Sequence, residues 1–466
     1  MMKYLLQWWT ANRKLGLLLG LLMVLAIGGG GARADIDSLL FVRPVSAILL
    51  VIGAATLTRS DIQAHRWLFV LLLALVALAI IHLLPLPPAI WEAAPGRELI
   101  VAAGAFFGDS QPWRPLAMVP WMAWNSLFAM IIPLAALVLA VQLSNRQLAQ
   151  LLPFLIVVGV TSAFLGLLQS IGPANSVLYF YDITNKGAPV GLFANRNHAS
   201  VFLAMLIPIV VAYLSMPAKT VERLRQRLFF AGIALAIAIP VIAVSRSRSG
   251  IVVALVGLIG SALLYRRPQA ERVERRKRQS INPRWVIAGG VFFALVVSSF
   301  LAGRSTSLEK LFEADGLDDM RSTVWSATWG SLFDFLPWGS GFGSFVEVYK
   351  IFEPEGSLQL NYVNHAHNDY LELLLAAGIP GALILVGALI ILTRCARKAW
   401  SKAGSKDTEI IVLGRLGTLL LAQLAVASAV DYPVRVPLIA AVATIAAVMS
   451  YRAGEFKIRS APSVES

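Results

Sequence analysis

The sequence predicts an all-α integral membrane protein that crosses the bilayer about twelve times. Of its 466 residues, 58% are hydrophobic and only 14% are charged, whereas an ordinary soluble domain carries about 25% charged residues. Apolar runs recur along the whole chain, and each approaches the roughly 20 residues that a helix needs to cross a bilayer. These observations predict a polytopic membrane protein.

The predicted spans follow one another without a soluble domain between them, so residues 1–466 are expected to form a single transmembrane domain. The first run follows basic residues and precedes Ala-Arg-Ala, as in a secretory signal peptide, but eleven further runs behind it favour a first transmembrane helix. Charged or Pro/Gly-rich segments separate the runs. The predicted spans lie near residues 15–28, 44–58, 67–84, 120–142, 151–171, 198–216, 228–245, 249–265, 285–302, 371–393, 410–430 and 437–452.

The lysines and arginines predict the orientation, because cytoplasmic loops of membrane proteins are enriched in these residues. Segment 266–284 carries eight of them, and counting crossings from it puts the other basic segments and both termini on the same, cytoplasmic face. The net charge of +14 is therefore a topology signal, and no nucleic-acid partner is expected. The other basic segments are 218–227, 394–406 and the chain end, and the segments predicted on the opposite face are 85–119, 172–197, 303–370 and 431–436.

The long segment 303–370 is the main extramembrane piece that the sequence predicts. It contains ten acidic residues against four basic ones, which fits a translocated loop. Within it, the apolar spacing of 318–335 predicts an amphipathic helix. The run Pro-Trp-Gly-Ser-Gly-Phe-Gly-Ser-Phe at 337–345 predicts a glycine-rich turn.

Two of the five histidines in the chain stand directly before the tenth predicted span, in NHAHNDYLELLLAAGIPG at 364–381. Burying an unpaired polar group in lipid costs several kcal/mol, so His365 and His367 are site candidates. An imidazole titrates near neutral pH and can act as a general base, a role for which His367 is the better candidate. The alternatives are a helix-capping or packing histidine, or a metal ligand together with Asp369 or Glu372; no third histidine in the same loop supports the metal.

Several arginines are predicted on the same face as these histidines. Arg246 and Arg248 lie in VSRSRSG, Arg321 begins the amphipathic segment, and Arg196 and His198 lie in GLFANRNHAS. A guanidinium binds a phosphate or diphosphate bidentately without a metal. For any one of these arginines alone, a local ion pair or a side chain reaching toward the membrane surface is the alternative.

Other sequence features narrow the function. The single cysteine, Cys395, excludes an internal disulfide and a thiolate metal cluster. The predicted spans are almost free of charge at mid-membrane, and no internal repeat is evident, which disfavours a transporter. No glycine-rich phosphate loop is present, so the energy for a reaction is expected to come with the substrate, without a cofactor.

The motifs resemble the signature of the O-antigen ligase and polymerase superfamily of bacterial envelope enzymes. GLFANRNHAS, SRSRSG, R-S-T-V-W-S-A, D-F-L-P-W-G-S-G-F-G-S-F and HNDYLELLLAAGIPG occur in the order that is usual in this family. The specific resemblance covers residues 190–381, and the predicted number of spans extends it loosely over the chain.

The resemblance implies a metal-independent glycosyltransferase in the bacterial inner membrane, with its active site on the periplasmic face. The donor would be a glycan on undecaprenyl diphosphate, and the ligase branch would invert the anomeric carbon. By matching positions, Arg248 and Arg321 would hold the diphosphate and His367 would activate the acceptor hydroxyl. The remaining candidates for substrate binding are Arg196, His198, Arg246, His365 and Asn368.

The resemblance leaves the acceptor open. A ligase transfers the glycan to the lipid A core, which is the leading hypothesis, and a polymerase transfers it to another repeat unit of O-antigen or exopolysaccharide. Further alternatives are a protein O-oligosaccharyltransferase and a non-enzymatic transporter of lipid-linked glycans.

Overall fold

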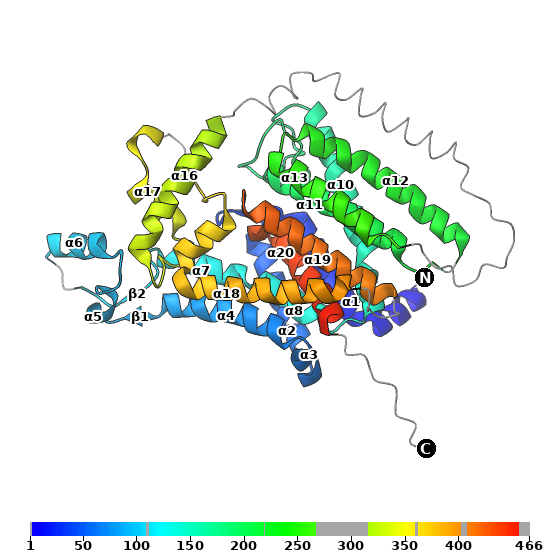
Figure 1. Cartoon of the computed structure of the whole chain (residues 1–466), viewed down its shortest axis with the longest axis horizontal. Helices are drawn as coiled ribbons and strands as arrows, with labels where there is room; N and C mark the ends of the chain where they lie inside the picture. Colours follow the sequence, from blue (N-terminus) through cyan, green and yellow to red (C-terminus); the bar gives the residue numbers. More distant parts are fainter. Residues whose placement is uncertain are drawn as a thin grey trace, which may run out of the picture.

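A computed structural model of the chain describes residues 2–108, 111–218, 220–266, 316–358, 362–401 and 408–455. It shows a helical bundle with one two-residue antiparallel strand pair in the described residues (Figure 1). Eight helices in the described part are long and apolar enough to cross a membrane, and two shorter apolar helices accompany them. The protein is thus an all-α polytopic membrane protein, as predicted, whereas the count of twelve spans stays a prediction.

Helices occupy eleven of the predicted spans, and the span predicted at 285–302 lies outside the described residues, as does nearly all of the basic segment 266–284. The amino-terminal elements are α1 (Met2–Gly28), α2 (Leu39–Ala55), α3 (Arg59–Ala64), α4 (Arg66–Leu83), β1 (Pro85–Leu86), α5 (Pro88–Trp91), α6 (Glu98–Phe106), β2 (Arg114–Pro115), α7 (Pro120–Ala129), α8 (Ile131–Ala140), α9 (Asn145–Ala149), α10 (Leu151–Ile171), α11 (Arg196–Ser215), α12 (Val221–Val244) and α13 (Arg248–Leu264). The later elements are α16 (Gly316–Leu332), η1 (Phe333–Phe335), α17 (Phe345–Phe352), η2 (Glu355–Ser357), α18 (Asp369–Trp400), α19 (Thr408–Ser428), η3 (Pro433–Arg435) and α20 (Pro437–Glu455).

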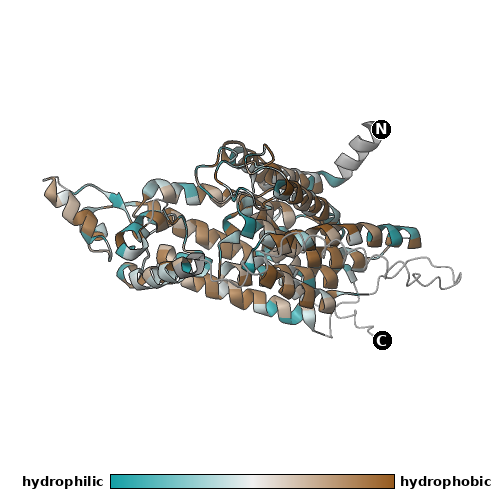
Figure 2. Ribbon diagram, turned by 90° about the horizontal axis from the view of Figure 1, so that it is seen from above, coloured by the Kyte–Doolittle hydropathy of each residue, from teal (hydrophilic) through white to brown (hydrophobic). Residues whose placement is uncertain are grey.

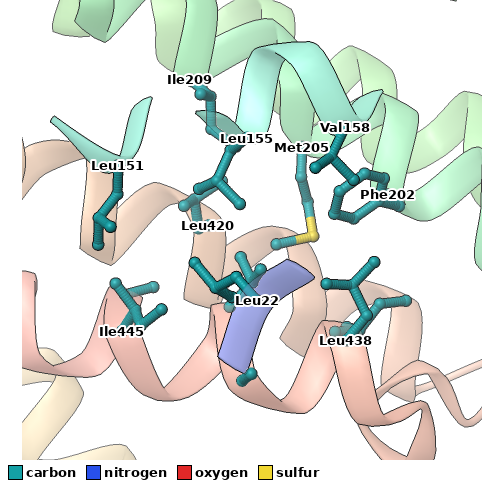
Figure 3. Packing of buried hydrophobic residues seen from close by; sticks show 14 of the residues in the cluster. Leu22, Leu151, Leu155, Val158, Phe202, Met205, Ile209, Leu420, Leu438 and Ile445 are labelled. Atoms are coloured by element: carbon teal, nitrogen blue, oxygen red, sulfur yellow. The ribbon is translucent and has the colours of Figure 1, made fainter. Parts of the chain in front are cut away.

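Side chains from distant helices interlock at the centre of the bundle (Figure 3). Leu22 of α1, Leu155 of α10 and Met205 of α11 meet Leu420 of α19 and Ile445 of α20 in one buried cluster. Hydrophobic residues predominate along most of the helices (Figure 2), as expected for helices that cross a bilayer. In the most apolar 18-residue window of α11, 83% of the residues are buried, so this helix lies at the centre of the bundle.

The segments predicted on the non-cytoplasmic face contact one another at one end of the bundle. Met118 N donates to the Ser340 carbonyl at 2.8 Å, which joins segment 85–119 to the long segment 303–370. Asn364 Nδ2 lies 3.3 Å from the hydroxyl of Tyr432, which joins that long segment to 431–436. These contacts agree with the predicted grouping of the segments on one face.

The amphipathic helix predicted at 318–335 is present as α16 and η1. The glycine-rich turn that follows packs into a break in α18. Ser340 N and Gly341 N donate to the carbonyls of Leu375 and Ala376, at 2.8 and 2.9 Å, and Gly378 has a φ of 55° inside the helix. The span predicted as continuous at 371–393 is therefore broken at Gly378, about two turns after its start.

Candidate functional site

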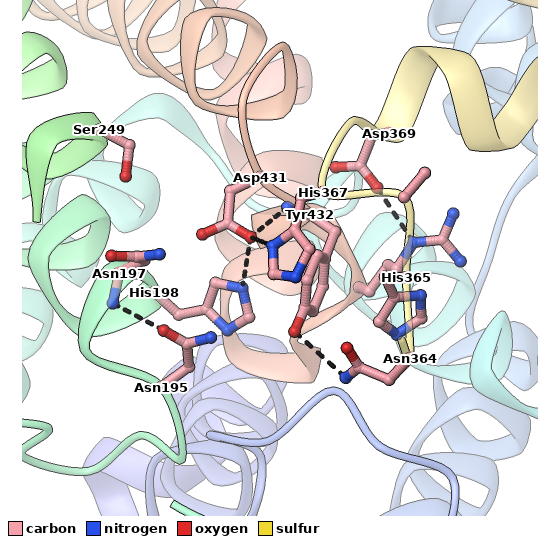
Figure 4. Close-up of polar contacts among 12 residues, drawn as sticks. Asn195, Asn197, His198, Ser249, Asn364, His365, His367, Asp369, Asp431 and Tyr432 are labelled. Atoms are coloured by element: carbon pink, nitrogen blue, oxygen red, sulfur yellow. Dashed lines mark hydrogen bonds and ion pairs between the residues drawn. The ribbon is translucent and has the colours of Figure 1, made fainter. Parts of the chain in front are cut away.

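Three segments that lie far apart in the sequence meet in one polar cluster (Figure 4). They are the start of α11, residues 364–369 at the start of α18, and residues 431–435 between α19 and α20. Asn195 caps α11 by accepting from Asn197 N at 2.8 Å, and Asn368 caps α18 by accepting from Tyr370 N and Leu371 N at 3.1 Å. Each cap fixes the direction in which the neighbouring histidines leave the helix end.

Asp431 is the anion at the centre of this cluster. Its side chain is fully buried, and its Oδ1 lies 3.3 Å from His367 Nδ1 and 3.0 Å from its neighbour's backbone nitrogen at Tyr432. Burial acts to raise the pKa of Asp431, but the neighbouring imidazoles of His198 and His367 outweigh it and hold this pKa well below its usual range. Asp431 is therefore a carboxylate that faces an imidazole, as in catalytic His–Asp pairs.

His367 has a backbone conformation that non-glycine residues rarely adopt, with a φ of 50°. Among the described residues, the other non-glycine residue with a positive φ is Arg246, at 55°. Such conformations cost about 1–3 kcal/mol each and persist where the surrounding structure enforces them, often at functional sites. Both residues are candidates from the sequence, and the enforced backbone at His367 turns its ring toward Asp431.

His198 approaches Asp431 from the opposite side. Its Nε2 lies 3.8 Å from Asp431 Oδ1, and its side chain is 2% exposed. Neither ring nitrogen of His198 has a hydrogen-bond partner within the described residues, nor has Asp431 Oδ2. A buried polar atom without a partner is costly, so a bound water or ligand group is expected to complete these bonds.

The ring of Tyr432 lies among three histidines. Its centroid is 4.2 Å from that of His365, 4.9 Å from that of His198 and 5.1 Å from that of His367. Burial, with the neighbouring Asp431 charge, raises the pKa of Tyr432 to about 12. The phenol therefore stays neutral and spaces the three imidazoles apart.

A buried ion-pair network adjoins the histidines on the α18 side. Arg435 Nε lies 3.0 Å from Asp369, and Arg435 NH1 lies 3.2 Å from Glu372. Glu372 also contacts His365 Nδ1 at 3.0 Å, and Ser428 Oγ donates to Asp369 at 2.9 Å. Burial acts to lower the pKa of Arg435, but Glu372 and Asp369 outweigh it and raise this pKa. The network ties the first turn of α18 to the loop that carries Asp431.

Arg248 is the first residue of α13, at the end of the helix nearest the start of α11. Ser247 caps α13 by accepting from Gly250 N at 3.1 Å. Gly250 itself packs so closely on Ser200 of α11 that an added Cβ would lie 2.3 Å from the Cβ of Ser200. This contact holds the Arg246–Arg248 segment beside the α11 end that carries His198, and both arginines are half-buried.

Arg321 lies on α16, one turn before Trp325. The indole Nε1 of Trp325 donates to the Ala366 carbonyl at 2.8 Å, between His365 and His367. Residues four apart share one face of a helix, so Arg321 lies on the face of α16 that meets the histidine segment. The backbone of Arg196 begins α11 and donates to Asn185 at 2.9 Å.

The structure thus draws the histidine and arginine candidates toward one end of the bundle, and it adds residues that the sequence did not single out. Asp431, Tyr432 and Arg435 lie in the short segment 431–436, which the sequence predicted only as an external loop. The sequence signal that could have identified them is the presence of charged residues in so short a loop between two apolar spans. The sequence suggested Asp369 and Glu372 as possible metal ligands, whereas the structure pairs both with Arg435.

A cavity of about 1020 Å³ opens beside the cluster. His365, Asp369, Glu372 and Arg435 form part of its polar wall, and apolar residues of several helices form the remainder. His367, Arg248 and Arg321 do not line it. In the described part of the chain, no group of three histidine, cysteine, aspartate or glutamate side chains is arranged to hold a metal ion.

Comparison with known proteins identifies one related family. A comparison with curated protein sequences finds no match. Residues 233–386, about a third of the chain, match the family model described as O-antigen ligase. This region includes Arg246, Arg248, Arg321 and His367, and the match supports glycan transfer of the O-antigen ligase or polymerase type in general. This match confirms the resemblance of residues 233–386 to the O-antigen ligase and polymerase superfamily.

Proposed function

We propose that the protein is a glycosyltransferase that moves a glycan from undecaprenyl diphosphate to an acceptor hydroxyl on the periplasmic face of the inner membrane. The lipid A core is the proposed acceptor, as in an O-antigen ligase. The observation that carries this proposal is the pairing of His367 with buried Asp431, at the bundle end to which the arginine-bearing segments also converge.

His367 is the proposed general base. Its Nδ1 faces Asp431, so its Nε2 is left to accept the proton of the acceptor hydroxyl as the oxygen attacks the anomeric carbon. The imidazolium that forms is stabilised by the Asp431 carboxylate 3.3 Å away. The proton of the hydroxyl thus ends on His367, and the new glycosidic bond replaces the bond to the diphosphate.

Arg248 and Arg321 are the proposed ligands of that diphosphate. Their guanidinium groups would balance the charge that grows on the leaving group, an electrostatic contribution that is often the largest single term in catalysis. Arg196, Arg246 and His198 lie along the same end of α11 and α13 and are proposed to contact the donor as well. With the arginines binding the diphosphate and His367 acting as the base, the proposed mechanism needs no metal ion.

The family model covers ligases and polymerases alike, so the repeat-unit polymerase is the second candidate. Glycan transfer to protein and transport of the lipid-linked glycan are weaker alternatives. The carboxylate that holds His367 favours a reaction over transport, because a cargo-binding site needs no oriented base.

The proposal is tested by glycan transfer in vitro. Purified protein in detergent receives a repeat unit on undecaprenyl diphosphate, together with lipid A core and a chelator. We expect transfer to the core that is abolished in His367→Gln and retained in His65→Gln, a buried histidine elsewhere in the bundle. Elongation of the glycan on its own carrier would establish the polymerase instead, and absence of turnover with both acceptors would contradict the proposal.

A further inference from the structure

The cavity beside the histidine cluster extends far along α18. Its α18 wall runs from Asp369 to Leu392, which is roughly 35 Å of helix at 1.5 Å per residue. The hydrocarbon core of a bilayer is about 30 Å thick. Leu389 lines the cavity and is nevertheless 45% exposed, so the cavity is open on the side where α18 faces lipid.

The chemistry of the cavity changes along this length. Near α18's first turn its wall is polar, with Asn364, His365 and Arg435. Deeper in the bundle the wall is aliphatic. The deeper residues include Leu385, Ala388, Leu421, Leu424, Ala440 and Ala443. A ligand that matches both parts has a polar head and long apolar chains.

The charged residues of the cavity single out one arginine. Arg33 pairs with Asp35 at 2.7 Å, Lys350 pairs with Glu347 at 2.9 Å, and Arg435 pairs with two carboxylates. Arg43 of α2 is the one lysine or arginine on this wall that has no carboxylate partner among the described residues.

Arg43 lies in an apolar helix and donates to Asn125 Oδ1 of α7 at 2.7 Å, while its buried Nε has no hydrogen-bond partner within the described chain. A second pocket of about 550 Å³ also borders Arg43. An arginine this close to lipid is costly unless an anion balances it. A phosphate would satisfy both the charge and the remaining guanidinium donors.

The position of the cavity also indicates which substrate it serves. It reaches the cluster at His365 and Arg435, whereas the proposed diphosphate ligands Arg248 and Arg321 do not line it. In an inverting displacement, the attacking hydroxyl and the leaving group lie on opposite sides of the anomeric carbon, so the two substrates approach from different sides. Because neither proposed diphosphate ligand lines the cavity, the acceptor fits it better than the donor does.

We propose that this cavity binds the lipid anchor of the acceptor, with its chains along α18 and a phosphate of its head at Arg43 and Asn125. The assignment to the acceptor rests on the proposed function, whereas binding of an anionic lipid in the cavity can be tested without the transfer reaction. It assigns Arg43 and Asn125 to recognition of an anionic lipid.

A binding experiment tests the lipid site without any transfer reaction. Full-length protein in detergent is titrated with phosphatidic acid that carries a fluorescent acyl chain. We expect Arg43→Gln and Ala388→Trp to weaken binding about tenfold, while Ala382→Trp on the same helix, which does not line the cavity, and exposed Arg59→Gln leave it unchanged. Equal affinity of wild-type protein and Ala388→Trp for the fluorescent lipid would overturn the lipid site. Displacement of the fluorescent lipid by inorganic phosphate as effectively as by unlabelled phosphatidic acid would overturn it as well.

A transfer experiment tests the acceptor role. With lipid A core as acceptor, Arg43→Gln and Ala388→Trp are expected to raise the KM for the acceptor about tenfold and to leave the KM for the donor unchanged. A rise in the donor KM instead would assign the cavity to the carrier and overturn the proposal. Lipid binding by a wild-type protein that transfers no glycan would overturn the proposed function, and the acceptor role with it.

Discussion

Asp431 is the negatively charged residue of the histidine cluster. Replacing it with asparagine removes the charge and keeps the size of the side chain. In Asp431→Asn, the amide fills the same space but cannot stabilise an imidazolium on His367. We expect kcat for glycan transfer to fall by up to about 10⁴-fold, the loss seen when the histidine of a serine protease loses its carboxylate. The KM for the donor should change little, because Asp431 does not contact the diphosphate in the proposed mechanism; a larger effect on KM than on kcat would contradict the positioning role.

The same residue makes folding stability depend on pH. The unfolded chain takes up a proton on Asp431 near pH 3.9, whereas the lowered pKa in the folded protein delays protonation to more acidic pH. The stabilisation is therefore complete above about pH 4 and is lost as the pH falls through the folded pKa. Thermal unfolding in detergent from pH 7 to pH 3 should show a smaller acid-side loss of Tm in Asp431→Asn, with exposed Asp37→Asn behaving like wild type.

Arg246 is expected to separate stability from activity. Glycine adopts a φ of 55° without strain, so Arg246→Gly recovers conformational energy of about 1 kcal/mol that offsets the contacts of the lost side chain. We expect a Tm within a few degrees of wild type and a higher KM for the diphosphate-linked donor. Unchanged donor kinetics in a stable Arg246→Gly variant would remove Arg246 from the donor site.

At the scale of single elements, the break in α18 depends on Gly378 and on Gly339 of the glycine-rich turn, which lie against each other. An added Cβ at Gly378 would lie 2.2 Å from the Pro337 carbonyl oxygen, and Ile379 N donates to the same oxygen at 2.9 Å. Gly378→Ala should therefore lower the free energy of unfolding by more than about 1 kcal/mol. Gly387→Ala in the same helix, whose Cβ would meet only Leu71 at 3.5 Å, should be nearly neutral, and equal stability of the two variants would show that the break tolerates a side chain.

The helices of this protein were predictable from the sequence, but the break in α18 was not. Composition and length predicted the spans, because a helix in lipid must satisfy its own backbone and carry apolar side chains throughout. The apolar spacing of 318–335 predicted α16 for a similar local reason. The break at Gly378 is not local, because it exists only where residues 337–341 supply hydrogen bonds to Leu375 and Ala376.

At the scale of the whole molecule, the candidate site also contains residues that local sequence indicates and residues whose role depends on distant contacts. His367 and Arg248 could be proposed from the sequence because each stands in a motif at the end of a predicted span, and Arg321 because it stands in a motif of the long segment 303–370. Asp431 and Arg435 were not, because their importance depends on partners 64 and 66 residues away, at His367 and Asp369. Their segment was predicted on the same face as the histidine segment, but the pairing between the two segments depends on the packing of α18, α19 and α20.

The orientation of the bundle in the membrane is the remaining prediction from the sequence, and single cysteines can test it. The one native cysteine is removed as Cys395→Ala, and Glu355→Cys and Lys398→Cys are then introduced separately; both positions are exposed in the structure. Because lysines and arginines favour the cytoplasmic face, a membrane-impermeant maleimide should label Glu355→Cys in intact spheroplasts but Lys398→Cys only after permeabilisation. The reverse pattern would place His367 and the cavity mouth in the cytoplasm, where undecaprenyl-diphosphate donors presented in the periplasm could not reach them.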